Sequence, residues 1–188
     1  MTLEPADRSR LLGLARHSIE QGLESPAAPA PLPAEPFAPA LVAPAASFVT
    51  LKRGGRLRGC RGMIEPVRPL AEDVWHNAWA SAFDDPRFPP LHATELDDLR
   101  VAISVLSALE RVGAASESEL LGQLQPGHHG LVLALGPRRA TFLPQVWESL
   151  PEPGQFLDEL KAKAGLPRDF WSPDIEAWRY GTETLSED

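Results

Sequence analysis

The chain has 188 residues, of which 43% are hydrophobic and 23% are charged. These values are typical of a globular protein that can build a core without disulfides or a structural metal. Its single cysteine excludes an internal disulfide, and no signal peptide or bilayer-spanning apolar run is evident. The net charge of −8 disfavours a general nucleic-acid binder, because phosphate contacts need clustered Lys and Arg. We therefore expect a soluble, cytoplasmic protein with no membrane partner.

The N-terminal part predicts one helix and a long connector. Apolar side chains recur at helical spacing over residues 5–21, and Gly22 is expected to end that helix. Residues 25–46 are rich in proline and alanine, which block both helices and strand ladders. This segment is therefore predicted to be an extended connector.

Residues 48–62 predict a β-hairpin, because an apolar, β-branched run is followed by Gly54-Gly55. A tight two-residue turn would place Arg53 opposite Arg56, and like charges in that position destabilise a hairpin. We therefore expect a four-residue loop.

The symmetric loop pairs Val49 with Cys60 and puts Cys60 on the face that also carries Leu51. Gly59 and Gly62 weaken the end of this strand, as happens where a backbone bulges or comes close to a ligand. The surroundings of Cys60 thus depend on the hairpin register.

Beyond the hairpin, the periodicity predicts further helices and strands in a recurring order. The predicted elements are a helix at 69–83, a strand at 100–107, a short helix at 116–125, two strands within 130–143, a helix at 154–164 and a strand at 175–180. The order hairpin, helix, strand occurs at 48–107 and again at 131–180.

This order predicts an α+β fold with mainly antiparallel sheets, packed helices, two β-β-α-β repeats and an extra N-terminal helix. We expect a single domain, residues 1–188. It would comprise the helix and connector at 1–47, a first half at 48–110 and a second half at 111–188.

A basic cluster surrounds the cysteine, with one acid, Glu65, in its midst. Its members are Lys52, Arg53, Arg56, Arg58, Arg61 and Arg68. On an acidic protein, such a cluster indicates a local anion site; equally, it can be a solvated hairpin whose charges protect an edge strand.

Cys60 can be interpreted in two ways. As a nucleophile, it would gain from the neighbouring Arg58 and Arg61, because positive charge favours the thiolate, and His129 is one candidate base. As a structural residue, it would be a small buried thiol packed on Val49, which the strand pattern alone favours.

Other polar groups are weaker candidates. His128 and His129 adjoin and so point apart, which leaves a metal held by His129, Cys60 and Glu65 as a minor alternative. No metal site is therefore predicted. In the segment DDPRFPPL, Asp84 and Asp85 are expected to pair with Arg87, although the prolines are also typical of a rigid helix stop. Further on, Gln145 and Glu148 provide polar groups between apolar anchors.

Six ordered segments resemble the AMMECR domain family, whose bacterial and archaeal members are called AmmeMemoRadiSam system protein A. They are FVTLKRGGRLRGCRG, DPRFPPL, VAISVLSALE, GHHGLVL, TFLPQVWE and FLDELKAKAGLP. The resemblance implies an α+β fold with two β-β-α-β repeats and an exposed motif at Leu57–Gly62, in which Arg61 replaces the usual apolar residue. It also implies two companions, a Memo-like protein and a radical SAM protein.

Two hypotheses follow. In the first, the chain is an enzyme or enzyme subunit whose pocket binds an anionic small molecule or modified group. Arg58 would hold the anion, Cys60 would react and His129 would move protons. Gly59, Arg61, Gly62, Glu65, Arg87, Gln145 and Glu148 would complete the binding site. In the second, the same groups bind a protein partner, a nucleotide or, less readily, RNA without catalysis. The sequence specifies no cofactor.

Overall fold

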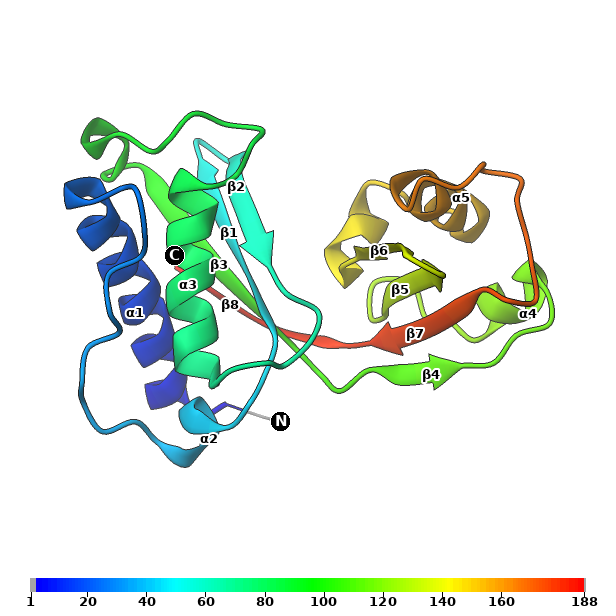
Figure 1. Cartoon of the computed structure of the whole chain (residues 1–188), viewed down its shortest axis with the longest axis horizontal. Helices are drawn as coiled ribbons and strands as arrows, with labels where there is room; N and C mark the ends of the chain where they lie inside the picture. The colour runs from blue at the N-terminus through cyan, green and yellow to red at the C-terminus, as the bar shows by residue number, and fades with distance from the viewer. Residues whose placement is uncertain (1–2, 188) are drawn as a thin grey trace. The chain divides into compact units, whose positions relative to one another are not determined.

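The computed structural model describes residues 3–187 (Figure 1). These residues form two compact units, the first made of residues 3–106 and 183–187 and the second of Ser107–Thr182. Each unit is built on a four-stranded sheet accompanied by helices, which confirms the predicted α+β class. The expectation of a single domain stays a prediction.

The first unit packs helices against one sheet. Its elements are α1 (Pro5–Glu24), α2 (Pro39–Val42), β1 (Ser47–Arg53), β2 (Arg56–Gly62), α3 (Leu70–Phe83), the 3₁₀ turn η1 (Ala93–Glu95), β3 (Leu99–Leu106) and β8 (Thr182–Ser186). The strand order is β2-β1-β3-β8, so β2 lies at an edge of the sheet. Helix α3 packs against β1 and β2, and α1 packs against α3 (Figure 1).

The predicted N-terminal helix is confirmed, and its buried stripe is Leu11, Ala15 and Ile19, each 0% exposed. Burying a side chain such as Ile19 contributes about 1.5–3 kcal/mol. The expected end at Gly22 is wrong. A Cβ atom there would lie 2.2 Å from the Phe83 ring, so the glycine allows the close approach of α1 to α3 rather than ending α1.

The second unit has the same kind of architecture. Its elements are β4 (Glu110–Val112), α4 (Glu117–Gly122), β5 (Gly130–Leu135), β6 (Arg138–Phe142), the 3₁₀ helix η2 (Pro144–Glu148), α5 (Pro153–Lys163) and β7 (Glu176–Tyr180). The strand order is β4-β7-β5-β6, and all the pairs are antiparallel. Phe156 of α5 is fully buried and stacks on Trp147, with ring centroids 3.8 Å apart.

The two predicted repeats are confirmed by the element order. They are β1-β2-α3-β3 and β5-β6-α5-β7, and their strands occupy matching positions, β2-β1-β3 in one sheet and β6-β5-β7 in the other.

The hairpin turn differs from the prediction. Gly54 and Gly55 both have positive φ, 54° and 76°, so the turn has two residues and Arg53 does stand opposite Arg56. The expected four-residue loop is wrong because the like-charge contact is relieved from elsewhere. The Nε atom of Arg53 donates to both carboxylate oxygens of Asp98, at 2.8 Å each.

Candidate functional site

The register of the hairpin places Cys60 on the face opposite to the one expected. Thr50, not Val49, stands across from Cys60, and Leu51 is paired with Gly59. The shift arises at a β-bulge, where Arg58 is the extra residue of β2. Because a slip of one residue turns every later side chain over, Cys60 points away from the face that packs on α3.

Two glycines allow this path of the chain. A Cβ atom on Gly59 would lie 2.0 Å from the carbonyl oxygen of Ser81 in α3, and one on Gly62 would lie 2.4 Å from the Phe48 ring. Both positions therefore need the absence of a side chain. Strand β2 therefore lies close to α3 at Gly59, just before the cysteine, and close to the Phe48 ring at Gly62, just after it.

The peptide groups of Cys60 are held by Asp85 and Arg87, an arrangement that we call the Asp85–Arg87 clamp. Asp85 Oδ2 accepts from the Cys60 N–H at 2.9 Å and from Nη2 of Arg87 at 2.6 Å, and Oδ1 accepts from Arg87 Nε at 2.9 Å. Arg87 Nη2 also donates to the Cys60 carbonyl at 3.2 Å. The expected pairing of Asp85 with Arg87 is confirmed. Asp84 instead pairs with Arg61, at 3.0 Å.

The charges of the clamp are fixed at neutral pH. The hydrogen bonds from Arg87 hold the pKa of Asp85 well below its usual range, against the opposing effect of burial, and the backbone N–H of Cys60 adds to the lowering. The pKa of Arg87 is raised, first by its hydrogen bond to Asp85 and also by the charges of Asp85 and Cys60. The guanidinium is thus held against the backbone of Cys60.

The clamp also has a structural effect on the edge of the sheet. The N–H and C=O groups of Cys60 bond to the clamp rather than to β1, so they lie on the outer edge of β2. Unpaired groups on an edge strand invite pairing with another chain. The clamp covers them at this position.

Cys60 as a whole residue is half-buried. Its hydrogen-bond contact within residues 3–187 is with the hydroxyl of Thr50, at 3.3 Å between Sγ and Oγ1. Since the side chain lies on the face away from α3, the sulfur is not part of the apolar core formed with that helix.

Arg58 is committed to an acid. Its Nε and Nη2 atoms donate to the two oxygens of Glu95 at 2.8 and 3.0 Å, and Nη2 also donates to the carbonyl of Pro89 at 3.0 Å. These bonds lower the pKa of Glu95 to about 2, against the effect of burial and with help from the His92 N–H. Arg58 and Glu95 therefore form a stable charged pair.

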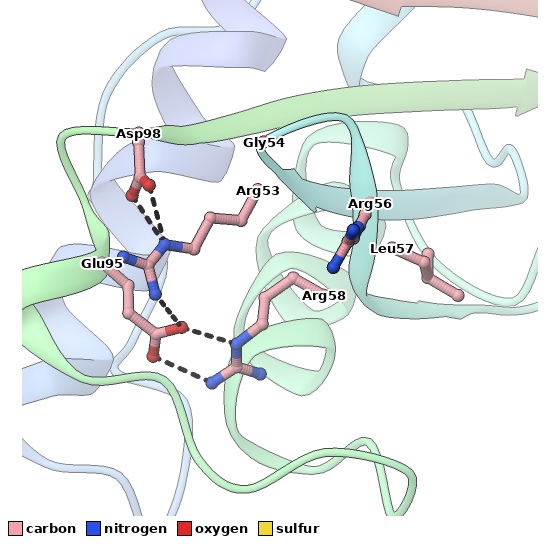
Figure 2. A pocket seen from close by; sticks show the side chains of 7 residues that line it. All are labelled: Arg53, Gly54, Arg56, Leu57, Arg58, Glu95 and Asp98. Carbon is pink, nitrogen blue, oxygen red and sulfur yellow. Dashed lines mark hydrogen bonds and ion pairs between the residues drawn. The ribbon is translucent and has the colours of Figure 1, made fainter.

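An open pocket of about 470 Å³ lies at the turn end of the hairpin (Figure 2). Its lining residues are Arg53, Gly54, Arg56, Leu57, Arg58, Glu95 and Asp98. Cys60 is not among them, so the structure separates the Arg58 side chain in this pocket from the thiol.

The remaining candidates lie elsewhere. Glu65 is exposed in the loop after β2, and His129, Gln145 and Glu148 belong to the second unit. The Nδ1 atom of His129 accepts from the N–H of Gln125 at 3.0 Å. Burial lowers the pKa of His129, and the charge of Arg179 acts in the same direction. Whether these groups act together with Cys60 stays a prediction.

Residues 3–187 contain no group of three or more His, Cys, Asp or Glu side chains arranged to hold a metal ion. In the same range, every helix is too short or too polar to cross a membrane.

The fold and the site together define an α+β protein of two repeated units, with a clamped cysteine on an edge strand of the first. The sequence model of the AMMECR1 family matches residues 12–185, and the chain belongs to this family. It is 33% identical to Protein MK0488 of Methanopyrus kandleri, over 100% of this chain and 91% of the relative. It is 37% identical to a protein of Thermofilum pendens, over 95% of this chain and 85% of the relative. The crystal structure of the uncharacterized protein PH0010 from Pyrococcus horikoshii is similar with a TM-score of 0.90 and 33% identity, covering 99% of this chain and 94% of that one.

Sequence reasoning did not find Thr50 and Glu95 as partners of the site, and it did not connect Asp85 with Cys60. The available signal was the pair of glycines around Cys60, which indicates close backbone approach but does not say to what. Asp85 could be recognised in the segment DDPRFPPL, but its role as acceptor of the Cys60 N–H could not.

Proposed function

We propose that the chain is an enzyme subunit that presents the Cys60 thiol to a bound anionic small molecule or modified group. The observation that carries this proposal is the Asp85–Arg87 clamp, which holds the N–H and the C=O of Cys60, a residue that is half-buried. A reactive group must be held accurately, because small displacements from the productive geometry are costly in rate. The clamp supplies that accuracy for the thiol.

In this proposal Arg87 has two roles. It holds the carbonyl of Cys60 through Nη2, at 3.2 Å, and so fixes the backbone from which the thiol projects. Its side chain is 53% exposed, and its Nη1 atom has no hydrogen-bond partner within the described part of the chain, so that atom can hold an anion. Arg58, expected to hold the anion beside the thiol, is bonded to Glu95 instead.

His129 would act as a proton donor. Because its Nδ1 atom accepts a hydrogen bond and its pKa is lowered, the neutral ring carries its proton on Nε2. That proton could pass to a reacting group.

Membership of the AMMECR1 family supports the proposal that the chain works with a Memo-like protein and a radical SAM protein. Size-exclusion chromatography of the three purified proteins, mixed in pairs and together, tests this part. Co-elution of the chain with either companion is expected. Separate elution of all three in every mixture would contradict it.

The second candidate is a binding or adaptor subunit without catalysis. It is favoured by the surroundings of the sulfur, whose hydrogen-bond contact within the described residues is a hydroxyl rather than a basic group. In that case the clamp would serve to protect the edge strand. A protein or nucleotide partner would fit this candidate better than RNA, given the net charge of −8.

Labelling of Cys60 with iodoacetamide at pH 7 separates the two candidates. Replacing Arg87 by Gln removes the guanidinium that holds the Cys60 carbonyl and should slow labelling about fivefold, the effect of about 1 kcal/mol for a partly exposed contact. Arg87→Lys should retain most of the rate. The matched control is Arg61→Gln, since Arg61 is also next to Cys60 but pairs with Asp84. Equal rates in all four proteins, or faster labelling of Arg87→Gln, would favour the binding subunit.

A further inference from the structure

The pocket at the turn end of the hairpin is lined by three guanidinium groups and two carboxylates (Figure 2). It therefore has one positive charge in excess, on a protein whose net charge is −8. Its volume of about 470 Å³ lies within the range of small-molecule sites, about 300–1,000 Å³. The charge of its lining is therefore opposite in sign to the net charge of the protein.

Two of the arginines are neutralised by the two acids. Arg53 donates through Nε to Asp98, and Arg58 donates through Nε and Nη2 to Glu95. Figure 2 shows these pairs together on one side of the pocket. With a pKa of about 2, Glu95 stays ionised at physiological pH, so the pairs persist.

The excess charge resides on Arg56. This side chain is exposed, lines the pocket and makes no ion pair or hydrogen bond within residues 3–187. One nitrogen of Arg58, Nη1, is buried without an acceptor in the same part of the chain. A guanidinium without a partner presents a planar fork of donors that matches the oxygens of a carboxylate or phosphate group.

The two carboxylates limit what this fork can accept. Glu95 and Asp98 already pair with Arg58 and Arg53, so the lining offers a ligand one uncompensated positive charge. A group with one negative charge balances the single excess positive charge. Gly54, which has no atom within 4 Å of its Cβ position, leaves open space beside the fork.

We infer that this pocket is a second binding site, in which Arg56 holds the singly charged oxyanion of a small molecule, a carboxylate or a phosphodiester. The site is separate from Cys60, which does not line it. The inference therefore does not depend on the proposed role of the thiol.

The test is an NMR titration of the full chain at low salt, with acetate and with dimethyl phosphate as separate probes of the two oxyanions. Saturable shifts are expected for backbone amides at residues 53–58 and 95–98, with a dissociation constant on the order of 10 mM for one charge-assisted fork. The probe that binds more tightly identifies the oxyanion. If neither gives saturable shifts there, the inference is overturned.

Matched variants distinguish a site from general attraction. Arg56→Gln should weaken binding about tenfold, the value of one charge-assisted contact. Lys52→Gln removes an exposed charge from β1 that does not line the pocket, and it should leave binding unchanged. Equal weakening in both variants would overturn the inference. Cys60→Ser should bind the probe like the wild type, which keeps this result independent of the labelling experiment.

Discussion

Replacing Asp85 by Ala removes the centre of the clamp. The Asp85 side chain is only 2% exposed, and it accepts hydrogen bonds from the Cys60 N–H and from the backbone and guanidinium of Arg87. The substitution leaves the Cys60 N–H without an acceptor in a partly buried place, at a cost of about 1–3 kcal/mol. The guanidinium of Arg87 is 53% exposed and becomes solvated, which adds about 0–1 kcal/mol.

We therefore expect the free energy of unfolding to fall by about 2 kcal/mol at pH 7. With a urea dependence of about 2 kcal/mol per molar, the midpoint of the first unit should fall by about 1 M. Since the pKa of Asp85 is depressed in the folded chain, its stabilising effect is present above its ordinary pKa of 3.8 and is lost as the pH falls below that value. The gap between the wild type and the variant should shrink accordingly in acid.

The matched control is Asp84→Ala, because Asp84 is 58% exposed and its pair with Arg61 lies at the surface. That variant should lose less than about 1 kcal/mol. Hydrogen exchange of the Cys60 amide gives a local readout, which should be faster in Asp85→Ala and unchanged in Asp84→Ala. If the two variants unfold within about 0.5 kcal/mol of each other and exchange this amide equally, the clamp does not hold Cys60 as described.

Three further predictions concern stability, each measured by urea unfolding. Gly59→Ala should lower the free energy of unfolding by more than about 3 kcal/mol, because its methyl group would lie 2.0 Å from the Ser81 carbonyl oxygen. Gly13→Ala is the control: this helical position has no atom within 4 Å of the added Cβ, so the free energy of unfolding should rise by about 0.5–1 kcal/mol. Equal effects of the two substitutions would contradict the close approach of Gly59 to α3. Burial raises the pKa of Asp73 above the ordinary 3.8, so its contribution to stability is present below that value and declines as the pH rises. Asp73→Asn should therefore gain stability relative to the wild type between pH 4 and 7, and a constant difference would refute this. Lys161 is 0% exposed, but its two acidic partners are 37% and 44% exposed and stay solvated when the lysine is removed. Lys161→Met should therefore change the free energy of unfolding by less than about 1 kcal/mol. A loss above about 3 kcal/mol would contradict this and show that the ion pairs are net stabilising.

Helices and strands could be predicted where apolar residues recur with the period of the element and so form one face that packs on the core. The apolar stripe of Leu11, Ala15 and Ile19 can be recognised from residues close together in the sequence, and all three are fully buried as the pattern indicates. The repeat order could be read for the same reason. The end of α1 could not be predicted, because Gly22 is set by the packing of the Phe83 ring, which is far away in the sequence.

The candidate site was harder to predict because its geometry depends on long-range contacts. Alternation along β2 gives the wrong face for Cys60, since a bulge at Arg58 changes the register without any change in composition. The tight turn forms in spite of the pair Arg53 and Arg56 because the countercharge for Arg53 comes from Asp98, 45 residues later. Likewise, a proline-rich helix stop gives no sign that Asp85 will bond to a strand 25 residues before it.

We propose that the clamp presents a reactive thiol, and the rate of Cys60 alkylation by iodoacetamide at pH 7 tests this proposal. The rate is measured for the native wild-type chain and for the same chain unfolded in urea at the same pH. We expect faster reaction in the native chain, because Arg87 and Asp85 hold the backbone of Cys60 only when the protein is folded. Slower reaction in the native chain would contradict it and leave Cys60 as a packing residue of the edge strand.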